Sequence, residues 1–240
     1  MEPQRIAYGP DPLHFGDLRL PARAGPHPVV IFIHGGFWRA RFGLEHSAPF
    51  CEAITEVGIA TWNIEYRRVG QAGGGWPGTL DDVLRGTQFI EQIAQSYPID
   101  LRRVFLAGHS AGGHLALWVA AQNQIELRLA ISLGGVVDLR RAFELHLSSG
   151  AVEDFIGATP AGEPARYTAA SPIELLPMRT PQLLLHGTRD EIVPIELSDR
   201  FAAASNNCEL LRLEGDDHFD VIGDRGRAIL LPYLTCAELL

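Results

Sequence analysis

The 240-residue sequence contains no lysine, so all 20 of its basic residues are arginines. Without a lysine amine, the chain has no side chain for Schiff-base chemistry and no lysine general base. Cysteine is also scarce, because Cys51, Cys208 and Cys236 are the only three and form no Cys-x-x-Cys pair. They are predicted to be free thiols in a reducing compartment, which excludes a disulfide framework and a cysteine zinc site.

Positive charge and long apolar runs are lacking too. The formal net charge is −9, which argues against nucleic acid and against an anionic membrane surface as partners. No run in the sequence approaches the roughly 18 apolar residues of a membrane helix. The polar N-terminus is followed by no apolar segment of a secretory signal. We therefore expect a cytoplasmic protein that binds neither nucleic acid nor membrane.

Short apolar runs recur along the chain between stretches of helical periodicity. The apolar runs occupy residues 29–33, 59–63, 104–107, 129–133, 183–186 and 209–213. The helical stretches occupy residues 45–57, 80–97, 113–122, 194–204 and 223–234. Continuous apolar strands that alternate with amphipathic helices are typical of a parallel sheet covered on both faces, so the fold class is α/β.

The chain length and 46% hydrophobic residues suit a single domain, residues 1–240. Residues 14–20 alternate apolar and polar side chains and predict an antiparallel strand at the edge of the sheet. Residues 68–79 form a glycine-rich loop, and residues 138–181 combine a helix-like stretch at 139–147 with several loop signals. We interpret residues 138–181 as a small lid over the strand ends.

The sequence Gly-His-Ser-Ala-Gly at positions 108–112 directly follows an apolar run and precedes a helical stretch. A strand, this Gly-x-Ser-x-Gly pattern and a helix in succession are typical of a nucleophile elbow, in which the serine hydroxyl stands exposed at a sharp turn. Ser110 is therefore the candidate nucleophile. His109 and His114 flank this turn and are interpreted as packing or pocket residues.

A serine hydroxyl needs a base that takes its proton, and the base needs an acid that fixes its tautomer. Asp190 follows the apolar run 183–186, and His218 follows the run 209–213. The order Ser, Asp, His along the chain is the one associated with the α/β-hydrolase fold.

Upstream, the apolar run 29–33 ends in His-Gly-Gly-Phe-Trp at positions 34–38, where glycines allow backbone N–H groups to approach a developing oxyanion. With this fourth motif, the chain resembles the α/β-hydrolase superfamily over nearly its whole length. The His-Gly-Gly-x-Trp motif, WNIEYR at 62–67 and Ala-Ser-Pro at 170–172 resemble the branch of kynurenine formamidases (arylformamidases) and carboxylesterases.

The resemblance implies a mostly parallel central sheet with helices on both faces. It also implies a triad with Ser110 as nucleophile, Asp190 as acid and His218 as base. The oxyanion donors implied by it are the backbone N–H groups of Gly36, Phe37 and Ala111. Further side chains near these loops are candidates for the substrate pocket: Phe37, Trp38, Trp76, His109, Phe143 and Phe155.

Other polar residues near strand ends have competing interpretations. Asp138 follows a different strand and is an alternative acid. His34 and His186 are expected to be hydrogen-bonded structural histidines. Asp216 and Asp217 precede the candidate base closely and are expected to shape its loop or face solvent. No His-Glu-x-x-His or comparable ligand spacing occurs, so we predict no metal.

Together these patterns predict a cofactor-independent serine hydrolase that cleaves a small carboxylic ester through an acyl-enzyme. An arylformamidase-type amide hydrolase, acting on N-formylkynurenine, is the nearest alternative and is suggested by the His-Gly-Gly-x-Trp motif. A peptidase and a non-catalytic binding module on a hydrolase scaffold are further alternatives. The oligomeric state is open between a monomer and a homodimer.

Overall fold

The sheet of the computed structural model, which describes residues 2–235, has eight strands in the order β1-β2-β4-β3-β5-β6-β7-β8. Six adjacent strands run parallel to one another: β3 His27–Ile33, β4 Ala60–Ile64, β5 Ile99–His109, β6 Leu129–Leu133, β7 Gln182–Gly187 and β8 Cys208–Leu213. The other two, β1 Gln4–Ala7 and β2 Phe15–Arg19, pair antiparallel. The mostly parallel α/β class predicted from the apolar runs is confirmed.

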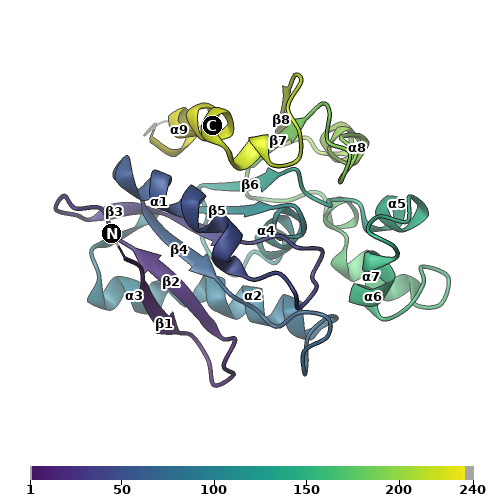
Figure 1. The fold of residues 1–240 in the computed structure, drawn as a ribbon, viewed down its shortest axis with the longest axis horizontal. Coiled ribbons are helices and arrows are strands. Elements are labelled where there is room, and N and C mark those ends of the chain that lie inside the picture. Colours follow the sequence, from purple (N-terminus) through teal and green to yellow (C-terminus); the bar gives the residue numbers. More distant parts are fainter. Residues whose placement is uncertain (1, 236–240) are drawn as a thin grey trace.

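Helices cover both faces of this sheet (Figure 1). One face packs against α1 Ala48–Glu56 and α9 Asp224–Thr235. The other face packs against α2 Gly78–Gln88, α3 Ile90–Ser96, α4 Ala111–Ala121 and α8 Glu196–Ala204. Because both faces are covered, every residue of β3, β4, β6 and β7 is buried, which explains why these strands read as continuous apolar runs.

Helix α4 is the helix that follows the Gly-x-Ser-x-Gly turn, and it runs through the core. Its residues 111–120 are all buried. A helix that is surrounded by protein is apolar on all sides and shows no polar stripe. The start of this helix is therefore held firmly in place, which matters for the side chain at its N-terminus.

Residues 138–181 fold into α5 Leu139–Glu144, α6 Ala151–Ile156, α7 Pro164–Ala170 and a 3-10 helix, Pro172–Leu175. Two more 3-10 helices, Leu44–Ser47 and Asp220–Ile222, precede α1 and α9. Figure 1 shows α5, α6 and α7 grouped to one side of the sheet. That this segment acts as a lid stays a prediction.

Two local expectations were wrong. The strand predicted at 14–20 is antiparallel, but it is not the edge, because β1 pairs along its outer side. β1 has only four residues, none of them buried, and so lacks an apolar pattern. The helical stretch 80–97 is two helices, since α2 ends at Gln88 and α3 begins at Ile90.

Within residues 2–235, no helix has both the length and the apolar character needed to cross a membrane. Cys51 and Cys208 are free thiols, as predicted, and Cys236 lies outside the described residues.

Candidate active site

Ser110 stands between the end of β5 and the start of α4, with φ of 57° and ψ of −121°. A non-glycine residue at such a positive φ is strained and has to be held by its surroundings. The flanking glycines are required by close backbone contacts: a Cβ on Gly108 would collide with the carbonyl oxygen of Gly112, and one on Gly112 with that of Ile33. This is the geometry of a nucleophile elbow.

Asp190 and His218 lie in the loops that follow β7 and β8, and a hydrogen bond of 2.6 Å joins His218 Nδ1 to Asp190 Oδ2. Both residues are buried. A carboxylate only accepts, so Nδ1 carries the hydrogen and Nε2 keeps its lone pair. The other carboxylate oxygen, Oδ1, accepts the N–H groups of Ile192 and Val193 at 2.9 and 2.8 Å.

Two histidines stabilise the charged form of the Asp190 carboxyl. Burial by itself would raise the pKa of Asp190, but the hydrogen bonds from His186 and His218 and from the Val193 N–H hold that pKa well below its ordinary value. His186 Nε2 donates to the Val193 carbonyl oxygen over 2.8 Å and lies 3.2 Å from Asp190 Oδ2, and its Nδ1 lies 2.7 Å from the Ser198 hydroxyl. His186 is therefore a hydrogen-bonded structural histidine, as expected, whose Nε2 lies beside the Asp190 carboxylate. The carboxylate stays ionised at neutral pH.

Ser110 and His218 line one cavity of about 340 Å³. His109 lines it as well, and its Nε2 donates to the carbonyl oxygen of His218 over 2.9 Å. The cavity therefore brings the candidate nucleophile and the candidate base together, and the residue before the serine holds the loop of the base.

The glycine turn after β3 also lines this cavity. Gly36 and Phe37 line it, with φ of 111° and 48°. A Cβ on Gly35 would lie 3.0 Å from the Cβ of Ser110, so only glycine allows this close approach. Ala111 is the first residue of α4, and its N–H therefore has no partner within the helix. Gly36 and Phe37 thus line the same cavity as Ser110, and Ala111 follows Ser110 directly in the chain. That these three residues are oxyanion donors stays a prediction.

Glu65 supports the glycine turn from behind, and the sequence reasoning gave it no role. Its carboxylate is 3% exposed. It lies 2.9 Å from His34 Nε2, accepts the N–H groups of Tyr66 and Leu44, and pairs with Arg68. The His34 ring stacks on Tyr66, whose hydroxyl donates to the His34 carbonyl oxygen. His34 is thus a structural histidine, as expected.

The buried network around Glu65 also sets its charge. Burial by itself would raise the pKa of Glu65, but the hydrogen bond from His34, the charge of Arg68 and the hydrogen bond from the Tyr66 N–H keep that pKa below its ordinary value. The carboxylate is therefore ionised at neutral pH and can act as a fixed acceptor beneath the turn.

Four of the predicted pocket residues do not line the cavity: Trp38, Trp76, Phe143 and Phe155. Trp38 is fully buried, stacks on Phe155 with ring centroids 4.6 Å apart, and donates from Nε1 to His114 Nδ1. Trp76 packs against the core, and its backbone N–H donates to the Phe155 carbonyl oxygen. These predictions were wrong because the rings pack into or against the hydrophobic core: Trp38 and Phe155 are buried in it, and Trp76 and Phe143 pack against it.

The alternative acid has other partners. Asp138 accepts the Arg141 N–H as the N-cap of α5, and its other oxygen pairs with Arg200 over 2.8 Å. Asp217 accepts the N–H groups of Phe219 and Asp220, so it shapes the loop of the base as expected.

The other residues that line the cavity were not found from the sequence: Arg41, Phe42, His46, Ser148 and Ile192, with Phe219. They come from loops separated by up to about 180 residues, and only Ile192 and Phe219 lie near a predicted catalytic residue. Within residues 2–235, no group of three or more His, Cys, Asp or Glu side chains is arranged to hold a metal ion.

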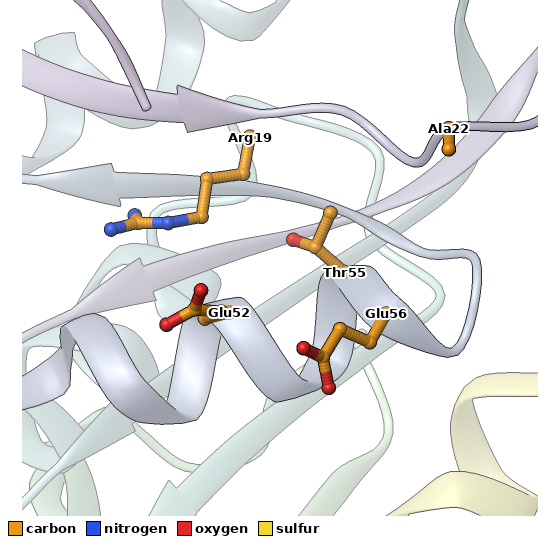
Figure 2. A pocket seen from close by; sticks show the side chains of 5 residues that line it. All are labelled: Arg19, Ala22, Glu52, Thr55 and Glu56. Atoms are coloured by element: carbon orange, nitrogen blue, oxygen red, sulfur yellow. The ribbon is translucent and has the colours of Figure 1, made fainter. Parts of the chain in front are cut away.

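A second cavity, of about 290 Å³, lies between β2 and α1. Figure 2 shows Arg19 reaching from β2 towards α1, which carries Glu52 and Glu56. Its remaining lining residues are Ala22 and Thr55, so it has no serine and no histidine. The chemistry of acyl transfer is therefore available only in the first of these two cavities.

Comparisons with known proteins show which proteins this chain is similar to. A model of the BD-FAE family matches residues 17–204. The probable isoprenylcysteine alpha-carbonyl methylesterase ICME of Oryza sativa subsp. japonica is 27% identical, over 90% of this chain and 58% of its own length. Esterase LipQ of Mycobacterium tuberculosis is 27% identical, over 74% of this chain and 45% of its own length. The chain thus spans about half the length of these curated relatives.

Solved structures share the fold. A truncated form of carbohydrate esterase from gut microbiota has a TM-score of 0.83 at 22% identity, covering 96% of this chain and 94% of that one. The thermophilic esterase Est2 of the Planctomycetes species Thermogutta terrifontis has a TM-score of 0.73 at 22% identity, covering 97% of this chain and 89% of that one. The predicted α/β-hydrolase fold is confirmed.

Proposed function

The chain belongs to the BD-FAE family, and from this premise we propose that it is a serine esterase that hydrolyses a small carboxylic ester through an acyl-enzyme on Ser110. The observation that carries the proposal is the hydrogen bond from His218 Nδ1 to Asp190, 2.6 Å long, with His218 and Ser110 on one cavity. The esterase names of the relatives support the same reaction class.

In the proposed reaction, the Ser110 hydroxyl attacks the ester carbonyl carbon and His218 Nε2 takes its proton. Asp190 holds the imidazole in the required tautomer and stabilises its cationic form. The negative oxygen of the tetrahedral intermediate accepts N–H groups of Ala111 and of the turn at Gly36 and Phe37. A donor of this kind lowers the barrier by about 3 kcal/mol in other acyl-transfer enzymes.

Collapse of that intermediate breaks the ester bond, and His218 returns its proton to the leaving alcohol. Water then attacks the acyl-enzyme with His218 again as the base, which releases the acid and restores Ser110. No step needs a metal or a cofactor, because the nucleophile, base and acid are all side chains of this chain.

Hydrolysis of a formamide would use the same nucleophile, base and acid. That the protein is an arylformamidase stays a prediction. The relatives described above carry esterase names, and no feature of the cavity favours an amide over an ester. We therefore place the ester first. The peptidase and binding-module alternatives have no observation in their favour.

The test compares wild type and Ser110→Ala on short p-nitrophenyl esters and on N-formylkynurenine. We expect ester turnover by wild type and a loss of about a thousandfold or more in Ser110→Ala, as for removal of a triad nucleophile. Equal unfolding midpoints would show that the variant folds. Turnover that persists in Ser110→Ala would contradict the proposal, and a preference for N-formylkynurenine would replace it by the formamidase.

A further inference from the structure

Arg41 lies at the mouth of the catalytic cavity, in the segment that follows the glycine turn. Its side chain is exposed, and its guanidinium carbon lies 4.6 Å from the centre of the Phe42 ring. A cation over an aromatic face is attracted by the ring, which limits the positions that the guanidinium takes. Arg41 therefore presents a partly oriented positive group beside the reacting centre.

The charge of Arg41 is not neutralised by a carboxylate. Among the described residues, no aspartate or glutamate pairs with it, whereas neighbouring Arg39 pairs with Asp154 and Arg68 with Glu65. Of the eleven described residues that line the cavity, Arg41 is the only one of the Asp, Glu, Lys and Arg types.

Two histidines of the cavity wall, His46 and His109, add no charge to that of Arg41. Burial lowers the pKa of His46, and burial together with the neighbouring His218 lowers the pKa of His109 to about 3. Both rings are therefore neutral at pH 7. The acid of the site, Asp190, is buried behind His218 and is already hydrogen-bonded. The cavity mouth consequently has a positive group with no negative partner, in a protein whose formal net charge is −9.

Exposed apolar side chains line the same cavity as this positive group. Phe42, Ile192 and Phe219 are 39%, 40% and 56% exposed and all line the cavity. They are three of the five exposed large hydrophobic residues in the described part of the chain. Exposed apolar groups that cluster at a cavity indicate a ligand that covers them. The mouth therefore suits a ligand with an apolar body.

We propose that the ester cleaved at this site carries a carboxylate beside an apolar acyl or aryl group, and that Arg41 binds this carboxylate. The proposal rests on the proposed esterase function. A planar guanidinium matches a carboxylate in a two-point hydrogen bond, which makes arginine a selective partner for it. The apolar body packs on Phe42, Ile192 or Phe219, and the carboxylate lies on the acyl or the leaving-group side.

Two substrate pairs, each an anion and its neutral isostere, test the proposal. The acyl-side pair is the p-nitrophenyl esters of 4-carboxybenzoic and 4-carbamoylbenzoic acid. The leaving-group pair is 4-carboxyphenyl and 4-carbamoylphenyl butyrate. The quantity measured is the ratio of kcat/KM for the anion to that for its neutral isostere, because intrinsic reactivity cancels when this ratio is compared between variants. The variants are Arg41→Gln, Arg41→Lys and Arg85→Gln.

Arg85 is the matched control, since it is an exposed arginine on α2 that does not line the cavity. We expect Arg41→Gln to lower the ratio by about tenfold for at least one pair, the size of one partly exposed charged hydrogen bond. The anion-to-neutral ratio of Arg41→Lys should lie between those of wild type and Arg41→Gln, and the ratio of Arg85→Gln should equal that of wild type. Added salt should lower the ratio in wild type. The pair that responds identifies the side that carries the carboxylate.

An unchanged ratio for both pairs in Arg41→Gln, or an equal fall in Arg85→Gln, would overturn the inference. Hydrolysis of the neutral esters that depends on Ser110 would still leave the esterase function standing in that case. If wild type and Ser110→Ala hydrolysed every ester equally slowly, the proposed function itself would be wrong.

Discussion

Each proposed catalytic group is oriented by another residue. Ser110 is kept at a positive φ by the close packing of its two flanking glycines. His218 is held at Nδ1 by Asp190 and at its carbonyl oxygen by His109. Because Nδ1 donates to the carboxylate, Nε2 is the nitrogen that can take a proton. The orientation of His218 is thus the feature that single substitutions test most directly.

Asp190→Asn should remove the charge that favours this tautomer while keeping the size of the side chain. We expect kcat to fall by about a thousandfold or more, because an amide can donate to Nδ1 and stabilise the wrong tautomer. The matched control is Asp138→Asn, which should keep kcat and the helix cap, because asparagine caps about as well as aspartate, and should lose at most about 1 kcal/mol of stability with the Arg200 ion pair. Steady-state kinetics and urea unfolding check both; a larger loss of kcat in Asp138→Asn would reverse the assignment of the acid.

At the scale of secondary-structure elements, the loops at the carboxyl ends of neighbouring strands hold one another. The turn after β3 is fastened to the residues that follow β4 through His34, Glu65 and Tyr66. The loops after β7 and β8 are joined by the Asp190 and His218 pair. A buried histidine and carboxylate pair therefore lies on each side of Ser110, one beneath the oxyanion turn and one at the base.

Glu65→Gln tests whether the pair beneath the turn acts on catalysis. A small displacement of the oxyanion donors should lower kcat by about tenfold to a hundredfold with little change in KM. Asp82→Asn is the control, because Asp82 is also buried and lies 2.8 Å from His14, outside the cavity. Both variants should lose about 1–3 kcal/mol of stability. Equal kcat in the two variants would show that Glu65 has a structural role only.

At the scale of the whole molecule, buried neutral histidines make stability depend on pH. His114 accepts the Trp38 indole N–H and donates to the Ala170 carbonyl oxygen, so it links α4, the segment after the glycine turn and residues 138–181. Burial lowers the pKa of His114 from 6.5 to about 4. At a pH between these two pKa values, His114 of the unfolded chain therefore binds a proton that His114 of the folded protein does not bind.

The sign of the effect follows from this difference in bound protons. The contribution of His114 to stability is complete above pH 6.5 and is lost as the pH falls towards 4, since the unfolded state gains the proton first. At pH 5 the loss should be about 2 kcal/mol. Urea unfolding at pH 7 and pH 5 should show a smaller loss in His114→Gln than in wild type, and an equal loss would contradict the assignment. Asp190, whose pKa lies below 3.8, does not titrate in this window.

Several elements were predictable because their patterns are local. The strand, turn and helix around Ser110 follow one another within about twenty residues, and strands buried on both faces are recognisable as apolar runs. β1 was missed because four partly exposed residues carry no such pattern, and its place at the edge depends on pairing with β2. The break between α2 and α3 likewise leaves the helical periodicity nearly intact.

The sequence by itself determined the fold class and placed Ser110, Asp190 and His218 at strand ends, because alternation of strands and helices and glycine turns are set by neighbouring residues. Only the tertiary structure decided that Asp190, and not Asp138, meets His218. It alone also decided that Trp38 packs inside while Arg41 reaches the cavity. The direction of a side chain beyond a turn depends on packing partners far away in the chain, which local patterns do not encode.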